Sequence, residues 1–199
     1  PNQPWALITA LLNGVIGPVI YIRWYSRFGG RDTTTLALGN TLPSFDLIDS
    51  QGQKVSSTDL STGTTLWLFF RGNWCPLCMA QIQEVAHDYQ ALAARGVRVC
   101  LVSPQPESNT QQLAKQFKVP MEFYSDANNA AARKLGILAE GGLPAGLQAL
   151  GYDSDVPMPT VISSKAGGEI IYSDLTENDR IRTEPADVMA SLDAAELVF

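Results

Sequence analysis

Thiols are the strongest nucleophiles that this sequence offers, and two of its three cysteines, Cys75 and Cys78, stand three residues apart. Cysteines at this spacing lie on one face of a helix, close enough to form a disulfide. At a helix amino terminus, free backbone N–H groups and the helix dipole stabilise a thiolate and lower the thiol pKa from ~8.5 toward ~3.5–7.5. The pair therefore predicts a redox centre with Cys75 as the nucleophile and Cys78 as the resolving thiol.

Three neighbours fit such a centre. Pro76 would occupy the first helical position, where its missing N–H leaves no hydrogen bond unmade. We expect Trp74 to shield one side of the sulfur and Arg71 to add positive charge near the thiolate.

A metal site is the competing interpretation of the cysteine pair, but a tetrahedral zinc needs four ligands. The remaining candidates are Cys100, inside a predicted strand, and His87, on the polar face of a predicted helix. We expect a buried core residue and a solvated residue respectively. No metal site is predicted, and no cofactor site either, since the Gly-Gly pairs do not precede a phosphate-binding helix.

The elements that must hold the cysteines follow from the apolar pattern. Residues 64–70 form a continuous apolar run typical of a central strand covered on both faces, and an amphipathic helix follows Cys75. Further strands are expected at 42–49, 54–56, 97–103, 121–125, 158–163 and 169–173, with helices at 108–117, 128–135 and 185–197. The first two strands form an N-terminal hairpin, Ser108 would cap the helix it begins, and 139–156 is an irregular insertion near the active face. This order predicts an α/β sandwich with parallel strands and antiparallel edges.

Residues 69–78 resemble the thioredoxin superfamily, and the later Met158-Pro159-Thr160 stretch strengthens the likeness. The resemblance implies a thioredoxin-like three-layer sandwich with a mixed central sheet. It also implies that Pro159 is cis and stands with Thr160 opposite the dithiol, where the preceding residue offers its backbone to a substrate disulfide.

A closer resemblance is to peroxiredoxin-like members of the alkyl hydroperoxide reductase / thiol-specific antioxidant family, over about residues 39–192. Its marks are the Phe70–Cys78 segment, the strand ending at Ser103, and the late Arg180-Ile181-Arg182 with Glu184-Pro185. A typical peroxiredoxin loop would place the peroxidatic cysteine on Cys78, a threonine on Cys75 and a proline on Arg71. The peroxide-orienting threonine is therefore a second thiol here, and the late-strand arginine is replaced by the Met158-Pro159-Thr160 stretch.

Other residues differ from one or the other pattern. Phe69 stands where thioredoxins often carry a buried aspartate, so that internal proton acceptor is missing. We interpret Arg180 and Arg182 as surface charges or as partners of Asp179 and Glu184.

Three functions remain open. The first is dithiol–disulfide exchange with a protein or small-molecule disulfide. The alternative is a thiol peroxidase that reduces hydroperoxides. Either enzyme would use a thiol electron donor of thioredoxin or glutathione type. A second alternative is a membrane-tethered module that binds metal or a client. The net charge of −6, with no basic stripe, excludes a nucleic-acid partner.

The N-terminal residues differ in composition from the rest of the chain. Residues 1–28 form an apolar segment with no charged side chain before Arg23, interrupted by Gly14, Gly17 and Pro18. Three interpretations compete: a membrane anchor, a helical arm that packs on its own domain or on a dimer partner through residues 5–25, and a disordered leader. Residues 29–40 are predicted to be a linker, and 41–199 the redox domain. If the segment spans a membrane, its C-terminal arginines place that domain in the cytoplasm.

Overall fold

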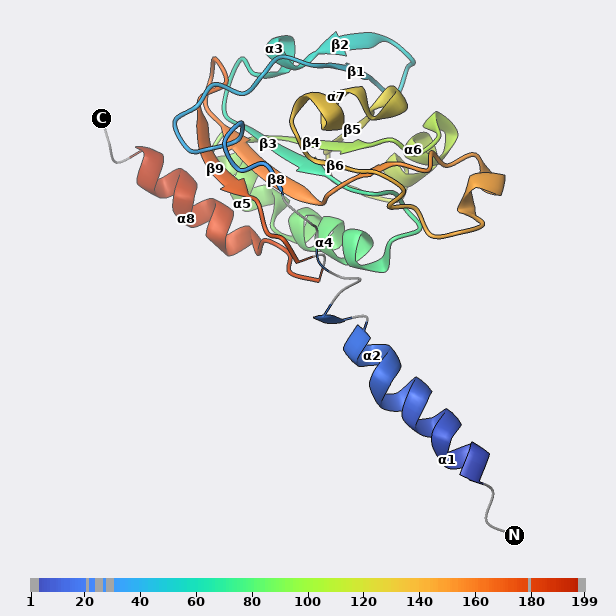
Figure 1. Ribbon diagram of the computed structural model, residues 1–199. Coiled ribbons are helices and arrows are strands. Elements are labelled where there is room, and N and C mark those ends of the chain that lie inside the picture. Colours follow the sequence, from blue (N-terminus) through green and yellow to red (C-terminus); the bar gives the residue numbers. More distant parts are fainter. Residues whose placement is uncertain (1–3, 21, 24–26, 28–30, 179, 197–199) are drawn as a thin grey trace.

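The computed structural model describes residues 4–20, 22, 23, 27, 31–178 and 180–196 (Figure 1). Its central sheet has seven strands in the order β2-β1-β5-β4-β3-β8-β9. Their bounds are β1 Asp46–Ile48, β2 Lys54–Ser56, β3 Thr65–Phe69, β4 Arg98–Ser103, β5 Glu122–Ser125, β8 Thr160–Ser164 and β9 Ile170–Asp174. Strands β3, β4 and β5 run parallel, and their neighbours β8 and β1 run antiparallel to them. The predicted mixed α/β sheet and its N-terminal hairpin are confirmed.

The middle strand β3 has every residue buried, as its uninterrupted apolar run predicted. Its side chains alternate between two cores because successive strand residues point to opposite faces. Leu66 and Leu68 belong to a core on the side of helix α4 (Pro76–His87), whereas Trp67 and Phe69 belong to a second core on the side of helix α7 (Ala130–Lys134). We call these the α4 core and the α7 core.

Helices cover both faces of the sheet (Figure 1). The α4 core receives side chains from α4 (Pro76–His87), α5 (Tyr89–Ala94), α6 (Glu107–Ala114) and α8 (Pro185–Glu196). The α7 core receives them from α3 (Ser57–Leu60) and α7 (Ala130–Lys134). This is the three-layer sandwich that the sequence predicted.

Several helix boundaries differ from the expected ones, and two of the differences have a clear local cause. The helix after the cysteines stops at His87 and resumes as α5, because Asp88 has φ −92° and ψ 6° and its carbonyl accepts the first bonds of the new helix. Helix α6 begins at Glu107 with Pro106 as its N-cap residue, since the Pro106 carbonyl accepts from Asn109 and Thr110. Ser108 is therefore inside the helix rather than its cap.

The insertion is largely irregular, as expected. Strands β6 (Leu138–Ala139) and β7 (Val156–Pro157) pair antiparallel and close its two ends. A short 3-10 helix, η4 (Leu147–Leu150), lies between these two strands. Another, η3 (Ala127–Asn129), precedes both strands and leads into α7. The closed base ties both ends of this segment to the domain.

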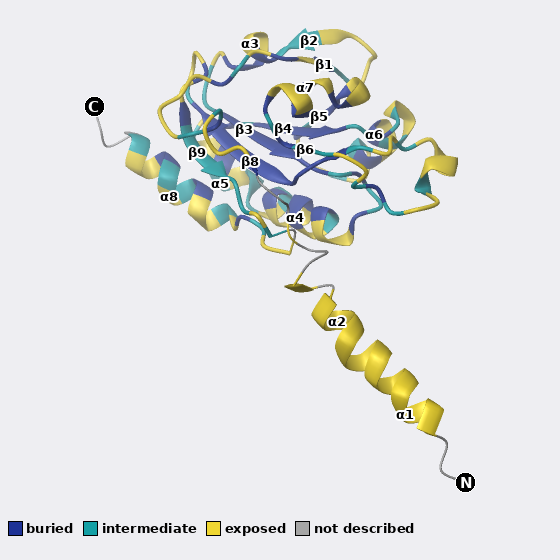
Figure 2. Ribbon diagram, viewed as in Figure 1, coloured by how far each residue is buried: buried dark blue, intermediate teal, exposed yellow. Residues whose placement is uncertain are grey.

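The apolar N-terminal residues form a helix made of α1 (Pro4–Leu11), a π-helical turn η1 (Leu12–Ile16) and α2 (Gly17–Ile20). The π turn precedes Pro18, which lacks the N–H that a regular turn needs. Every residue from Pro4 to Ile20 is exposed, and the helix lies apart from the sheet (Figure 2). The described residues Pro4–Ile20 therefore bury no side chain against the domain. Across the residues that are described, helices are too short or too polar to cross a membrane.

Residues 31–40, expected to be a linker, instead pack on the redox domain. Leu36 is fully buried in the α7 core, and Arg31 is buried as well. The segment is held by backbone bonds from Gly39 N–H to the Ile170 carbonyl and from Ile170 N–H to the Asn40 carbonyl. The polar composition around Thr33–Thr35 favoured a linker, but the neighbouring Leu36 side chain completes the α7 core. Residues 28–30 lie outside the described part.

Candidate active site

The two cysteines lie at the junction of β3 and α4, where the loop 70–75 leaves the carboxyl end of the parallel strands. Cys75 is the N-cap residue of α4 and Pro76 is the exposed first helical residue, as predicted. The Cys75 N–H donates to the Gly72 carbonyl at 3.2 Å, and the Cys75 carbonyl accepts from Met79 at 3.0 Å. These bonds fix the first sulfur at the amino end of a twelve-residue helix.

Glycine is required at position 72 of this loop. Gly72 has φ +145°, and a Cβ built there would lie 2.8 Å from the Trp74 indole nitrogen. Trp74 itself is half-buried and packs against the α4 core beside the dithiol. The Trp74 indole therefore packs directly against the turn at Gly72, next to Cys75 in the loop.

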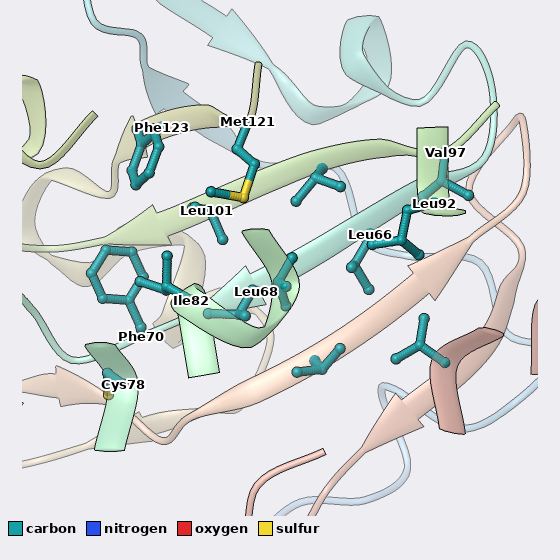
Figure 3. Close-up of a cluster of buried hydrophobic side chains, with 14 of the residues drawn as sticks. Leu66, Leu68, Phe70, Cys78, Ile82, Leu92, Val97, Leu101, Met121 and Phe123 are labelled. Carbon is teal, nitrogen blue, oxygen red and sulfur yellow. The ribbon is translucent and has the colours of Figure 1, made fainter. Parts of the chain in front are cut away.

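The two thiols have unequal environments, although both are free. Cys78 is 0% exposed and lies in the α4 core with Ile82 on the same face of α4 (Figure 3). Cys75 is 5% exposed, at the edge of that core. The helix period produces the difference, because Cys78 and Ile82 are four residues apart and point inward together.

The electrostatics follow the same asymmetry. The pKa of Cys75 is lowered from 9.0 to about 6, first by the hydrogen bond from Cys78 to its sulfur, against the opposing effect of burial. The pKa of Cys78 is raised, because it donates that hydrogen bond and because it is buried. One thiol is thus poised as a thiolate and the other as its proton-bearing partner.

Two arginines add positive charge. Arg71, named from the sequence, and Arg182 both lower the pKa of Cys75 by their charge. The sequence predicts Arg182 to be a surface charge or a partner of acidic neighbours. It instead lies half-buried before α8, and its charge lowers the pKa of both thiols. Arg182 is far from the cysteines in the sequence, so no motif could indicate that it lies near them in the fold.

The proline-threonine pair stands beside the strand end that leads to the redox loop, since Thr160 pairs in register with Phe69. Thr160 is buried and its hydroxyl donates to the Met158 carbonyl at 2.7 Å. The expected cis peptide at Pro159 is wrong, because the described peptide bonds include no cis bond. The chain runs extended from β7 through Met158, whose N–H donates to the Ile137 carbonyl, and the trans form continues that path into β8.

Arg31, from the segment expected to be a linker, holds this pair in place. Its guanidinium donates to the Thr176 carbonyl at 2.8 Å and also contacts the Pro159 carbonyl and the Thr160 hydroxyl. Burial lowers the pKa of Arg31 to about 10, and the charge of Asp174 opposes that effect. No local motif announced this residue, because its partners lie more than 120 residues further along the chain.

The other residues that could join the site lie elsewhere. Cys100 is buried in the α7 core, on the opposite face of the sheet, and burial raises its pKa. This agrees with the expected role as a core residue. His87 is exposed at the end of α4. Within the described residues, no three His, Cys, Asp or Glu side chains are grouped to hold a metal ion.

A mixed sheet whose central strand β3 leads directly into a helix that begins at a dithiol defines a thioredoxin-fold protein. The chain belongs to the AhpC/TSA family, whose model matches residues 38–173. It is 27% identical over 139 residues to the thiol-disulfide oxidoreductase ResA of Geobacillus thermodenitrificans, covering 69% of this chain and 75% of that protein. It is 28% identical over 108 residues to the chloroplastic peroxiredoxin Q of Gentiana triflora, covering 53% of this chain and half of that protein.

Solved structures agree on the fold. The peroxidoxin BcpB of Mycobacterium tuberculosis superposes with a TM-score of 0.66 at 17% identity, covering 80% of this chain and 97% of that one. The predicted peroxiredoxin-like thioredoxin fold is therefore confirmed, and the family supports a thiol-dependent oxidoreductase function.

Proposed function

We propose that this protein exchanges disulfides, with Cys75 as the attacking thiolate and Cys78 as the resolving thiol. The observation that carries the proposal is the unequal pair: Cys75 at a helix amino terminus with a lowered pKa, Cys78 sealed in the core with a raised one. An attacking sulfur must meet substrates from outside, whereas a resolving sulfur needs to reach only its neighbour.

The reaction has two steps. The Cys75 thiolate attacks one sulfur of a substrate disulfide, forming a mixed disulfide and releasing the other substrate sulfur as a thiolate, which takes up a proton. Cys78 then gives up its proton and attacks the Cys75 sulfur, releasing the second substrate thiolate. The products are two substrate thiols and the Cys75–Cys78 disulfide. A dithiol donor of thioredoxin type, or two glutathione molecules, returns the pair to the reduced state.

The surrounding residues support the first step. Arg71 and Arg182 stabilise negative charge on Cys75. The backbone beside Pro159 and Thr160 borders the strand end leading to the cysteines, so a bound disulfide segment would lie against it. Trp74 walls the loop next to Cys75.

Trapping the mixed disulfide tests this assignment. We expect Cys78→Ser, incubated with insulin as the disulfide probe, to accumulate a protein–insulin mixed disulfide visible on a non-reducing gel. Cys75→Ser should accumulate none, and both variants should lose catalytic insulin reduction in the presence of dithiothreitol. The matched control is Cys100→Ser, which removes a buried thiol on the other face of the sheet and should behave as the wild type. A mixed disulfide in Cys75→Ser but not in Cys78→Ser would reverse the two roles.

A thiol peroxidase is the second candidate, favoured by the peroxiredoxin Q relative and the peroxiredoxin fold. Here the Cys75 thiolate would take one oxygen from a hydroperoxide, giving a sulfenic acid and an alcohol, and Cys78 would condense with it to release water. Stopped-flow mixing with cumene hydroperoxide, followed by intrinsic tryptophan fluorescence to which Trp74 contributes beside the dithiol, measures this rate. A rate constant no higher than that of a free thiol would exclude the peroxidase and leave disulfide exchange.

A further inference from the structure

The redox loop is held by side chains that come from outside the loop. The Asn73 N–H donates to Gln105 Oε1 at 2.8 Å, and Asn73 Oδ1 accepts from the Tyr152 hydroxyl at 2.5 Å. Asn73 thus has both its backbone and its side chain bonded to residues of other segments, two positions before Cys75.

The inner anchor, Gln105, continues as a buried chain of hydrogen bonds. Gln105 is 2% exposed, and its Nε2 donates to the Thr110 hydroxyl at 3.2 Å. The Thr110 hydroxyl also bonds the Ser125 hydroxyl at 3.2 Å. The loop is therefore tied to α6 and to the end of β5 through groups that have no access to water.

The outer anchor, Tyr152, is part of the irregular insertion between β6 and β7. Its hydroxyl accepts from Asn109 Nδ2 at 2.8 Å while it donates to Asn73, and its ring lies 3.5 Å from a Cβ built at Gly72. The insertion thus reaches the redox loop through one phenol, with the ring against the loop and the hydroxyl bonded to it.

The insertion is itself fixed on its other side. Asn129, fully buried at the start of α7, donates to Asp153 Oδ2 at 3.3 Å and to the Asp155 carbonyl at 2.9 Å. The residues adjoining Tyr152 are thus fastened to the domain. Because its neighbours are fixed in this way, the Tyr152 side chain can hold the redox loop in one geometry, as preorganised sites require.

We propose that Tyr152 is a positioning residue for the dithiol: through Asn73 it holds the turn that sets the Cys75 sulfur at the amino end of α4. The turn is short, because the Cys75 N–H bonds the Gly72 carbonyl directly. Rotation at Asn73 would therefore change where the sulfur lies relative to the helix terminus. This inference rests on the proposed role of Cys75 and adds to it the part of the fold that sets its reactivity.

Charged and titratable groups reach the Cys75 sulfur from three elements. Cys78 faces it from α4, Arg71 from the same loop, and Arg182 from the segment before α8. Arg71 belongs to the loop that Tyr152 holds, so loosening the loop would change the placement of both the sulfur and one of its stabilising charges.

The experiment removes only the hydroxyl. In Tyr152→Phe the ring still covers Gly72, but the hydroxyl's bonds to Asn73 and to Asn109 are both lost. The readout is the pH dependence of iodoacetamide alkylation, with the modified cysteine identified by peptide mass spectrometry. We expect the midpoint for Cys75 to move up, with a loss of thiolate of about two- to tenfold below the midpoint, the weight of one net hydrogen bond. The melting temperature should change little.

The matched control is Tyr89→Phe, which deletes an exposed phenol hydroxyl bonded to the Pro120 carbonyl at 3.4 Å. It should leave the midpoint unchanged. Asn73→Ala leaves the Asn109 bond to Tyr152 in place and removes the Tyr152–Asn73 bond. It should shift the midpoint as Tyr152→Phe does, and the double variant should shift it no further, because the hydroxyl acts on Cys75 through the bond that both changes remove.

The outcomes separate the two proposals. A wild-type protein alkylated first at Cys78 would overturn the proposed function. A wild type alkylated first at Cys75, with the same midpoint in Tyr152→Phe, would overturn only this inference, whether or not the melting temperature falls. Additive shifts in the double variant would equally overturn it, since Tyr152 would then act by a route other than Asn73.

Discussion

The hydrogen bond between the two thiols should control the reactivity of the centre, and replacing its donor tests this directly. The Cys78 thiol is the largest of the influences that lower the pKa of Cys75 from 9.0 to about 6. Cys78→Ala removes the donor, whereas Cys78→Ser keeps a hydroxyl that can donate. We therefore expect Cys78→Ala to raise the pKa of Cys75 and Cys78→Ser to keep most of the depression.

The size of the change follows from the strength of a hydrogen bond to a charged acceptor. Such a bond contributes about 1.5–3 kcal/mol, and one pKa unit corresponds to about 1.4 kcal/mol, so the midpoint should rise by about one to two units. At pH 7 a thiol of pKa about 6 is about nine-tenths thiolate, whereas one of pKa about 9 is about one-hundredth thiolate. Arg71 and Arg182 remain in the variant and keep the midpoint below 9.0.

The assay is the pH profile of alkylation at Cys75, fitted for its midpoint. A single rate at pH 7 would mislead, because a more basic thiolate is the better nucleophile, with a Brønsted coefficient of about 0.4–0.5 that offsets much of the lost thiolate. Circular dichroism should confirm that both variants remain folded. A midpoint in Cys78→Ala within a few tenths of the wild-type value would refute the reasoning and assign the low pKa to the arginines and the helix terminus.

Two further changes test other parts of the structure. Arg182→Gln should raise the alkylation midpoint of Cys75, because it removes a positive charge that lowers this pKa; an unchanged midpoint at low salt would show that the charge does not reach the sulfur. Leu36→Ala should lower the free energy of unfolding by about 2–5 kcal/mol, measured in urea, because this side chain is fully buried. A loss below about 1 kcal/mol would mean that residues 31–40 are a linker after all.

The sequence predicted the parts of the site that are local in the chain. The dithiol, the N-terminal proline of α4 and the buried central strand all follow from spacing and apolar pattern within residues 65–82. The mixed sheet and its two-sided packing could be inferred from the alternation of strands and helices and from the uninterrupted apolar run of β3. The parts of the site among these lie in one strand and at the start of one helix, so a local sequence pattern could indicate them.

The parts that were missed depend on contacts distant in sequence. Arg31, Arg182 and Tyr152 reach the site from three separate segments, and none carries a motif that ties it to Cys75. The isomer of the bond before Pro159 depends likewise on how β7 leads into β8. Sequence spacing cannot predict these contacts, because only the tertiary fold determines which distant segments lie beside the redox loop.

The division of labour between the two cysteines is set by where helix α4 begins. Cys75 is the N-cap residue, just outside the first turn, and Cys78 is the third helical residue, on the face that points into the α4 core. Since the inward face continues at Ile82, Cys78 cannot leave the core without unpacking that turn. Attack by Cys78 on an external substrate would require this turn of α4 to unpack, whereas Cys75, 5% exposed at the start of the helix, needs a smaller displacement. The start of the helix, more than the resemblance of either cysteine to a family position, is therefore the feature on which the proposed role of Cys75 as the attacking sulfur rests.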